Sequence, residues 1–405
     1  MKIVISSRGS RGDIYPVIEI ASALMEAGHE VVIGIPETFT EIANKKGLNA
    51  HLYPEDSGKV MKEMGSGMNA SKGGLSFITS SVNQQMDFMM DAAKDADVLL
   101  ASVSEIAAPT VGEYFNIPFY RLAYAPVLPG TQPHPLLPFQ GLSPRMNNFT
   151  WKTFALLSRY ILNKFVNNKR NELGLKPAKN PNRYFTGKSH TLLGINSTLA
   201  PPCPTWEKRY EFSYTGYCFG KPGGELSKEL TQFIEQGSTP VYIGFGSVHI
   251  KNPDKFTKMV IAASERSGVR VVLSRGWTGL GTKYYPDTVF VTEDTNHSLL
   301  FPKMAGVMHH GGSGTTHTGA KAGVPQFIMP EIVDQYYWAN RIYKLGLGPK
   351  PVSSKKLTVE KMTEALSELS NGQYREVAIR MGEKMKNENG VPEIVRIITS
   401  NNGTP

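Results

Sequence analysis

A chain of 405 residues, 40% hydrophobic and 20% charged, is long and apolar enough for two folded domains, which excludes a wholly disordered protein. Two cysteines are too few for a disulfide framework, and no apolar run reaches the roughly 18 to 20 residues that a membrane-spanning helix requires. The first residues enter a strand-like run directly, which leaves no room for a secretory signal. We therefore expect a cytoplasmic protein.

The formal charge of +9, from 44 basic and 35 acidic residues, favours anionic partners. No long basic tract interleaved with aromatic residues occurs, so nucleic acid is not an expected partner. A weak attraction to an anionic membrane surface is the better hypothesis for this charge.

The first third of the chain alternates strand and helix signals. Residues 2–7 form a β-branched run, residues 16–27 have helical periodicity and end at Gly28, and residues 29–35 and 98–101 are further strand candidates. Strands separated by helix-length segments predict right-handed crossovers and a mostly parallel sheet.

The same alternation starts again near residue 239. A helix is expected over residues 254–267, and the proline- and glycine-rich residues 201–225 are the best candidate for a linker between two α/β halves. The strand candidates of this half are residues 241–245, 269–274, 288–292, 305–309 and 326–329.

The glycine-rich residues 309–316 (HHGGSGTT) carry the strongest functional signal. They follow an apolar strand and precede a helix, so backbone N–H groups and the helix N-terminus can bind an anion. A simple tight turn with capping hydroxyls is the alternative, but the paired histidines favour a phosphate site. The segment matches neither GxGxxG nor the lysine-containing P-loop.

Asp334 and Gln335 follow the next strand, and in a parallel sheet they should lie beside the phosphate loop. A carboxylate next to an amide suits sugar hydroxyls. The alternative is that Asp334 only caps a helix.

Asp13 lies between the first strand and the first helix, where it could act as a general base towards an acceptor hydroxyl. Helix capping explains its position equally well.

The nine histidines show no metal-ligand spacing, so we expect no metal site. Residues 55–92 hold six of the sixteen methionines, which fit either ordinary core or an adaptable apolar pocket. They are Met61, Met64, Met68, Met86, Met89 and Met90.

Several short motifs occur in one order along most of the chain. They are residues 9–16 (GSRGDIYP), 215–217 (TGY) after Trp206, 244–247 (GFGS), 274–277 (SRGW), His297 with 300–302 (LFP), 309–316, and Asp334-Gln335. In this order they resemble family 1 glycosyltransferases of the GT-B fold, particularly the branch of sterol glucosyltransferases and bacterial glycopeptide or macrolide glycosyltransferases.

The resemblance implies an α/β protein with two Rossmann-like domains whose parallel sheets face each other across a cleft. Residues 1–205 would form the acceptor-binding domain, 206–225 the linker and 226–385 the nucleotide-sugar-binding domain. Residues 386–405 would return to the first domain as a helix.

The resemblance also implies which residues bind the donor, a nucleotide sugar with UDP-glucose as the default. The diphosphate would be held by Gly246, Ser247, His309, Gly311, Gly312, Ser313, Gly314 and Thr315. The base and ribose would lie near Arg275, Trp277, Thr295, Asn296 and His297, and the sugar near Asp334 and Gln335. No metal or further cofactor would be needed.

Asp13 would accept the proton of an apolar acceptor's hydroxyl during a single inverting displacement. The acceptor, such as a sterol, lipid or polyketide, would lie near Arg11, Met86, Met90, Pro126 and His134.

Two departures from the pattern affect the expected donor. Asn296 stands where the branch often has proline, and residues 331–333 (EIV) replace the usual aromatic or glycine-containing approach to Asp334. The alternatives are a dTDP-sugar-dependent enzyme, a sugar-nucleotide epimerase or hydrolase of the same fold, and a sugar-nucleotide-binding protein without catalysis.

Overall fold

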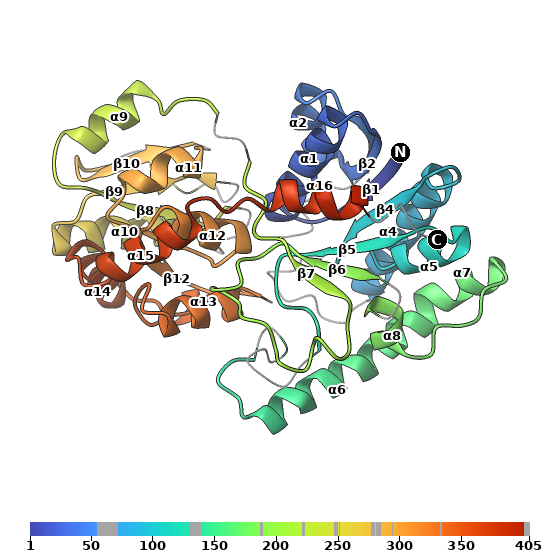
Figure 1. The fold of residues 1–405 in the computed structure, drawn as a ribbon. Coiled ribbons are helices and arrows are strands. Elements are labelled where there is room, and N and C mark those ends of the chain that lie inside the picture. The colour runs from blue at the N-terminus through green and yellow to red at the C-terminus, as the bar shows by residue number, and fades with distance from the viewer. Residues whose placement is uncertain are drawn as a thin grey trace. The chain divides into compact units, whose positions relative to one another are not determined.

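The structure is a computed structural model with two compact units. Unit 1 comprises Met1–Gly220 and Asn389–Pro405, and unit 2 comprises Lys221–Glu388. Each unit contains one parallel sheet with helices against it (Figure 1). The described residues are 1–54, 72–129, 136, 139–186, 189–220, 223–246, 250, 252–276, 280, 285–293, 295–332 and 334–400, with side chains of the helix at 72–92 described from residue 80.

The sheet of unit 1 has seven strands in the order β3-β2-β1-β4-β5-β6-β7, all paired in parallel. Strands β1 and β4 at its centre are apolar runs that are almost wholly buried, as expected for strands covered on both faces. The strand bounds are β1 Lys2–Ser6, β2 Glu30–Pro36, β3 Asn49–Tyr53, β4 Val98–Ser102, β5 Phe119–Ala123, β6 His190–Leu193 and β7 Phe212–Tyr214.

Helices α4 and α5 cover one face of this sheet, where Val4 and Leu99 share a core cluster with Met89 and Val111. The C-terminal helix α16 packs against α1. The helices of unit 1 are α1 Arg11–Glu26, α2 Thr40–Lys45, α4 Lys72–Ala92, α5 Ala108–Phe115, α6 Pro144–Ile161, α7 Asn167–Glu172, α8 Pro181–Thr186 and α16 Gly390–Ser400, with a 3₁₀ turn Glu37–Phe39 and a π-helical turn Leu162–Val166.

Unit 2 has a five-stranded parallel sheet in the order β10-β9-β8-β11-β12. Its strands are β8 Val241–Gly244, β9 Val271–Ser274, β10 Val289–Thr292, β11 Gly306–His309 and β12 Gln326–Ile328. Its helices are α9 Lys228–Glu235, α10 Pro253–Ser267, α11 His297–Leu300, α12 Ser313–Lys321, α13 Gln335–Lys344, α14 Val359–Ser370 and α15 Arg375–Met385, with 3₁₀ turns Phe301–Lys303 and Ser354–Lys356.

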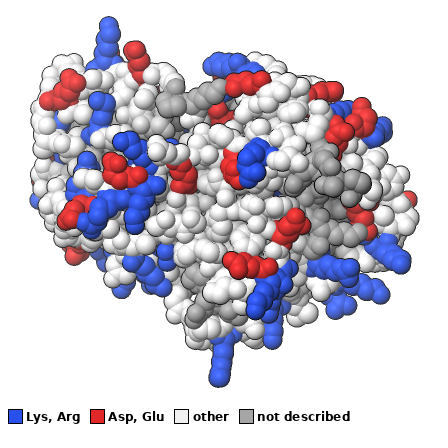
Figure 2. Space-filling view, viewed as in Figure 1, with Lys and Arg blue, Asp and Glu red and all other residues white. Residues whose placement is uncertain are grey.

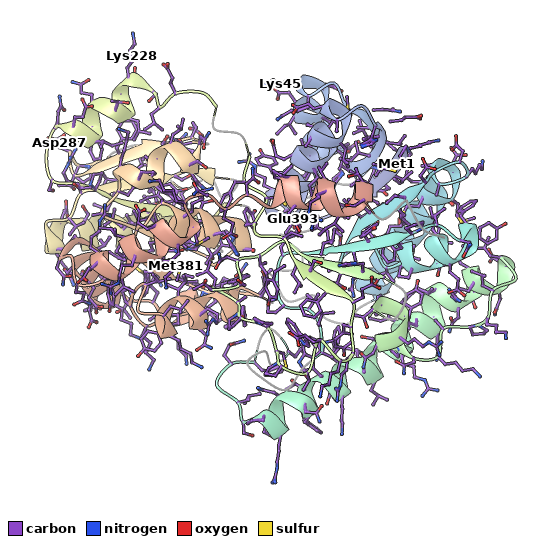
Figure 3. All side chains as sticks on the ribbon, viewed as in Figure 1. Met1, Lys45, Lys228, Asp287, Met381 and Glu393 are labelled. Atoms are coloured by element: carbon purple, nitrogen blue, oxygen red, sulfur yellow. The ribbon has the colours of Figure 1, made fainter. Side chains whose placement is uncertain are left out.

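Strand β8 shows how both faces of this sheet are covered. Val241 and Ile243 point into a cluster with α10 and α14, whereas Tyr242 between them packs with Leu300 and Phe301 on the other face. Side chains fill the space between sheet and helices throughout the drawn part of this unit (Figure 3). The buried polar residues Ser274 and His309 are the last residues of β9 and β11.

The predicted fold class, α/β with two parallel sheets, is confirmed. The first helix begins at Arg11, five residues before the expected start, because Ser10 and Asp13 cap it through side-chain and backbone hydrogen bonds.

Candidate functional site

The loops that follow the five strands of unit 2 all emerge at the carboxyl edge of its sheet, since the strands are parallel. Gly246 after β8 and Gly276 after β9 have positive φ angles of 54° and 53°, and a Cβ on Gly276 would lie 3.1 Å from the Gly246 carbonyl oxygen. Only residues without a side chain allow these two loops to approach so closely. The neighbouring predicted residues Ser247 and Trp277 lie outside the described residues.

The loop after β11 lies directly against the start of α13. Gly311 has a φ of 91°, and a Cβ there would lie 2.6 Å from Ile328 and 3.1 Å from the Gln335 carbonyl oxygen. The structure therefore brings the glycine-rich loop and the Asp334-Gln335 pair together.

Helix α12 begins in this loop, with Gly312 as its N-cap. The N–H groups of Ser313, Gly314 and Thr315 lie in the first helical turn, where no helical carbonyl can accept their hydrogen bonds. The first N–H that closes a turn is that of Thr316, which donates to Gly312. These groups and the helix dipole give the loop the character of an anion site.

His309, predicted as a phosphate ligand, is held by hydrogen bonds within the protein. Its ring is fully buried, its Nδ1 accepts from the Gly311 N–H at 3.0 Å, and its Nε2 donates to Gln326 Oε1 at 2.9 Å. Gln326 in turn donates to the Thr316 carbonyl. Burial lowers the pKa of His309 to about 3, so the ring is neutral and both nitrogens are already used.

His310, which belongs to the predicted phosphate loop but was not itself assigned to the diphosphate, has the free nitrogen that His309 lacks. Its Nδ1 is buried and has no hydrogen-bond partner among the described residues, and its ring lies next to Gly312 and Gly246, where an added Cβ would approach it to 2.5 and 3.4 Å. Burial, and secondarily the nearby His297, lowers its pKa to about 4. A neutral imidazole beside a helix N-terminus can donate a hydrogen bond to a phosphate.

The two histidines differ in their position relative to the end of strand β11. His309 is the last residue of β11 and belongs to the buried strand, whereas His310 is the first residue beyond it. The end of a strand can be placed from sequence only to within one or two residues. The sequence therefore does not show which of the two histidines lies inside the buried strand.

Gln335 and Asp334 also have structural bonds. The buried Gln335 accepts from the N–H groups of Glu331 and Ile332 at 2.8 and 3.1 Å, so it shapes the loop that precedes it. Asp334 is the N-cap residue of α13, and its Oδ2 accepts from the Trp338 indole N–H. The Asp334 side chain makes no capping hydrogen bond to the backbone of α13. Sugar binding by Asp334 stays a prediction, since a carboxylate accepts several hydrogen bonds.

The residues expected near the base follow β9 and β10. Asn296 caps α11 by accepting from the Ser298 N–H, and Thr295 bonds to Thr292 at 2.8 Å. His297 bonds to the Tyr242 hydroxyl at 2.9 Å. Arg275 is exposed beside Glu293, at 3.3 Å.

In unit 1, Asp13 lies in the first turn of α1 at the carboxyl edge of the sheet. Its Oδ2 accepts from the backbone N–H of Ser10 at 2.8 Å and from the Ser10 hydroxyl at 3.1 Å. Burial raises the pKa of Asp13, and the two bonds from Ser10 oppose that rise. The capping role is therefore present, and the carboxyl also has the raised proton affinity that a general base needs.

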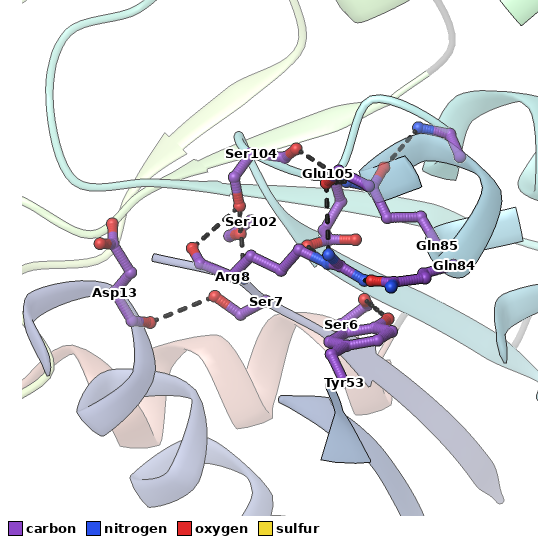
Figure 4. Close-up of polar contacts among 12 residues, drawn as sticks. Ser6, Ser7, Arg8, Asp13, Tyr53, Gln84, Gln85, Ser102, Ser104 and Glu105 are labelled. Atoms are coloured by element: carbon purple, nitrogen blue, oxygen red, sulfur yellow. Dashed lines mark hydrogen bonds and ion pairs between the residues drawn. The ribbon is translucent and has the colours of Figure 1, made fainter. Parts of the chain in front are cut away.

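Arg8 organises the loop before Asp13 (Figure 4). Its buried guanidinium lies over the Tyr53 ring at 3.7 Å and donates to Ser81 and Gln84 of α4 at 3.3 and 3.0 Å. Its Nε is 3.9 Å from a carboxylate oxygen of the buried Glu105.

The backbone of Arg8 is held as well. Its N–H donates to the Ser104 hydroxyl at 3.3 Å, and that hydroxyl lies 3.0 Å from the Arg8 carbonyl oxygen. Ser7 donates to the Asp13 carbonyl at 3.3 Å (Figure 4). The loop that carries Asp13 is therefore attached to β4's loop and to α4 rather than left open.

The described residues expected near the acceptor differ in burial. Met86 is 5% exposed and belongs to a core cluster, whereas Met90 is half-buried and packs against that cluster. Pro126 is buried after β5, and Arg11 is half-buried at the start of α1. His134, with Met61, Met64 and Met68, lies outside the described residues.

Two family comparisons cover most of the chain. Residues 3–129 match the glycosyltransferase family 28 N-terminal domain, and residues 271–400 match the erythromycin biosynthesis protein CIII-like C-terminal domain. The chain is a GT-B glycosyltransferase. It is related to sterol glucosyltransferases and to bacterial natural-product glycosyltransferases.

Among curated relatives, a sterol 3-beta-glucosyltransferase of Arabidopsis thaliana is 29% identical over 98% of this glycosyltransferase and 67% of its own length. One of Komagataella phaffii is 30% identical over 98% of this chain but 34% of its own. The glycosyltransferase thus spans from a third to two thirds of these relatives.

Solved structures support the same fold at lower identity. The calicheamicin glycosyltransferase CalG4 matches with a TM-score of 0.74 at 16% identity, covering 100% of this chain and 99% of its own. The glycosyltransferase VinC, solved in complex with DTDP, matches with a TM-score of 0.69 at 18% identity and 98% coverage of both chains. No helix among the described residues is long and apolar enough to cross a membrane.

Proposed function

We propose that this glycosyltransferase moves glucose from UDP-glucose to the hydroxyl of a sterol-like apolar acceptor, with inversion at the anomeric carbon. The observation that carries the proposal is the edge of unit 2, where His310 presents a buried nitrogen without a partner in the described part of the chain, beside the N-terminus of α12. Such an edge suits a diphosphate. The acceptor class follows the curated relatives, which are sterol 3-beta-glucosyltransferases matched over 98% of this chain.

In this proposal the donor diphosphate accepts hydrogen bonds from His310 and from the N–H groups of Ser313, Gly314 and Thr315. Gly246, Gly311 and Gly312 let the backbone approach it. Asp334 accepts hydrogen bonds from the sugar, and Gln335 keeps the loop of Asp334 in place through its bonds to residues 331 and 332. The loops with Arg275, Thr295, Asn296 and His297 are assigned to the base and ribose.

Asp13 is the proposed general base. The acceptor oxygen attacks the anomeric carbon, the bond from that carbon to the phosphate oxygen breaks, and the hydroxyl proton passes to the Asp13 carboxylate. UDP leaves with the added negative charge on its terminal phosphate. The helix N-terminus and His310 stabilise that charge, so we expect transfer to continue in the presence of EDTA.

The test is transfer from UDP-glucose to cholesterol or ergosterol in detergent micelles, followed by mass spectrometry of the product. Asp13→Asn should lower the rate by about 10² to 10⁴-fold, the usual contribution of a positioned acid or base. Ser10→Ala is the matched control, because it removes a bond to the same carboxyl but leaves the carboxylate. Wild-type turnover without a glucosylated sterol, or full activity of Asp13→Asn, would refute the assignment.

A dTDP-sugar donor is the second candidate, favoured by the likeness to VinC in complex with DTDP. Parallel titrations with UDP-glucose and dTDP-glucose distinguish the two. The first candidate requires the tighter binding and faster transfer to be those of UDP-glucose.

A further inference from the structure

Helix α6 exposes most of its large apolar residues, and three of the four side chains that it buries are polar. Of the eleven large hydrophobic side chains that are exposed in the described part of the chain, six belong to this one helix. They are Met146, Phe149, Phe154, Leu156, Leu157 and Tyr160, between 43% and 70% exposed. The residues that α6 buries are Asn147, Thr150, Trp151 and Ser158. A helix that faces water has the opposite pattern.

The exposed side of α6 carries two parallel stripes. Arg145, Lys152 and Arg159 are spaced by seven residues and therefore lie on one line along the helix, since each residue turns by about 100°. Phe149, Leu156 and Tyr160 follow the next line, also at spacings close to two and three turns. A basic stripe beside an aromatic and aliphatic stripe is typical of helices that lie in the plane of a membrane surface.

The charged residues of the chain segment that contains α6 are of one sign. No Asp or Glu occurs in the sequence between Glu113 and Glu172, a stretch that contains seven Lys and Arg residues. Among the described residues, the three basic side chains of the stripe have no ion pair with a carboxylate. Lys and Arg side chains project at the lower edge of the view in Figure 2, where Figure 1 places α6.

A hollow lined by both polar and apolar residues adjoins the basic stripe. It has a volume of about 300 Å³ and includes Lys152 and Arg209 together with the amides of Asn148 and Asn182. Two cations and two amides suit the phosphate of a lipid headgroup, since each can donate to its oxygens.

We infer that α6 is a docking surface for an anionic lipid bilayer, with Phe149, Leu156 and Tyr160 at the level of the headgroups and Arg145, Lys152 and Arg159 against lipid phosphates. An acidic protein would satisfy the charges but would not require aromatic and aliphatic side chains over four turns of exposed helix. A spanning orientation is excluded for α6, because three cations lie along its 18 residues. The inference does not depend on the proposed reaction.

The test is co-sedimentation with vesicles of phosphatidylcholine alone and with 30% phosphatidylglycerol added, at low and physiological salt. Wild type should bind the anionic vesicles far more strongly, and salt should weaken that binding. Arg145→Gln/Lys152→Gln/Arg159→Gln should lower the partition coefficient by about a hundredfold at low salt, since each basic residue near an anionic surface contributes about 1 kcal/mol. Leu156→Ser with Phe149→Ser should lower binding by at least tenfold even at physiological salt, where the charge contribution is small.

Matched controls distinguish binding through α6 from binding caused by net charge or by exposed apolar side chains elsewhere. Lys228→Gln/Lys258→Gln/Lys384→Gln removes the same charge from exposed helical positions of unit 2, and Tyr343→Ser with Ile379→Ser removes exposed apolar side chains there. Both controls should bind vesicles within about threefold of wild type, and circular dichroism should confirm that every variant is folded. UDP-glucose affinity, a property assigned to unit 2, serves as an independent readout.

Three outcomes would overturn the inference. The first is that wild type binds neutral and anionic vesicles equally. The second is that the unit 2 charge control loses as much vesicle binding as the α6 charge variant. The third is that light scattering shows a wild-type dimer, which Leu156→Ser dissociates. The last would make α6 a contact between two copies of the chain. Vesicle binding without transferase activity would refute the proposed function and leave this surface in place.

Discussion

The carboxyl edges of the two sheets are both polar, but they differ in whether their ionisable side chains are charged and paired or neutral. The edge of unit 1 holds ionisable residues in fixed bonds: Arg8 beside Glu105, and Asp13 bonded to Ser10. The edge of unit 2 holds His309 and His310, whose pKa values are about 3 and 4, beside the open N–H groups of α12. The first edge holds its carboxylates by hydrogen bonds and an ion pair, whereas the second presents N–H donors that suit an anion.

The strongest test of the fixed-charge edge is Arg8→Met. It leaves the Glu105 carboxylate buried without its cation, and we expect the free energy of unfolding to fall by about 3–5 kcal/mol. Urea unfolding followed by circular dichroism measures this change. Adding Glu105→Gln should recover at least half of the loss, because the buried charge is then removed.

Lys45→Met is the matched control, since Lys45 forms an exposed ion pair with Glu41 at 2.6 Å on α2 (Figure 3). It should cost less than about 1 kcal/mol. If Arg8→Met also lowered the free energy of unfolding by less than about 1 kcal/mol, the buried and exposed ion pairs would contribute equally. The prediction for the edge of unit 1 would then be wrong.

The neutral edge predicts sensitivity to acid. Burial depresses the pKa of His309 from 6.5 to about 3, so the unfolded chain binds the proton more readily than the folded one. The contribution of His309 to the free energy of unfolding is therefore complete above pH 6.5 and decreases as the pH falls towards 3. By pH 5 the loss should be about 2 kcal/mol. His309→Gln removes this titration, so its stability should fall less than that of wild type between pH 8 and pH 5 in thermal unfolding. Parallel stability curves for the two proteins would contradict the assignment.

The proposed assignment of the diphosphate to His310 rather than His309 gives a binding prediction. His310→Ala should raise the dissociation constant for UDP-glucose by about 10- to 100-fold, the usual value of a hydrogen bond to a charged group. His309→Gln should change stability but leave donor affinity within about threefold, because both ring nitrogens of His309 bond within the protein. Isothermal titration calorimetry on both variants decides the matter, and the reverse pattern would restore His309 as the phosphate ligand.

The sequence predicted the central strands because they are apolar runs buried on both faces, such as residues 98–101 and 241–245. It missed four strands of unit 1. Edge strands β3 and β7 have residues that are mostly half-buried or exposed and lack a clear period. Strands β5 and β6 are mostly buried but only five and four residues long. The clustering of the glycine loop with Asp334-Gln335 followed from strand order alone, and the structure bears out their proximity.

The partners of the site residues could not be predicted in the same way. His309 and Gln326 are seventeen residues apart, and Arg8 and Ser104 ninety-six, so their hydrogen bonds depend on how strands pair. Helix α6 was also missed, because its exposed apolar and buried polar residues reverse the pattern by which a water-facing helix is recognised.

The smallest expected effect is a pH dependence of donor affinity, and it separates the two edges most directly. In the free protein His310 is neutral, because burial lowers its pKa to about 4. A bound diphosphate favours the protonated ring and raises that pKa, so affinity should increase as the pH falls below the raised value. UDP-glucose is the suitable ligand, because its diphosphate ester keeps a constant charge over this range, unlike UDP. We expect the dissociation constant to fall severalfold, up to about tenfold, between pH 7.5 and pH 5.5.

His310→Asn should abolish the pH dependence, whereas Asp13→Asn should leave it intact. If affinity instead weakens in acid, or if Asp13→Asn flattens the profile, the charge that responds to the donor belongs to the edge of unit 1.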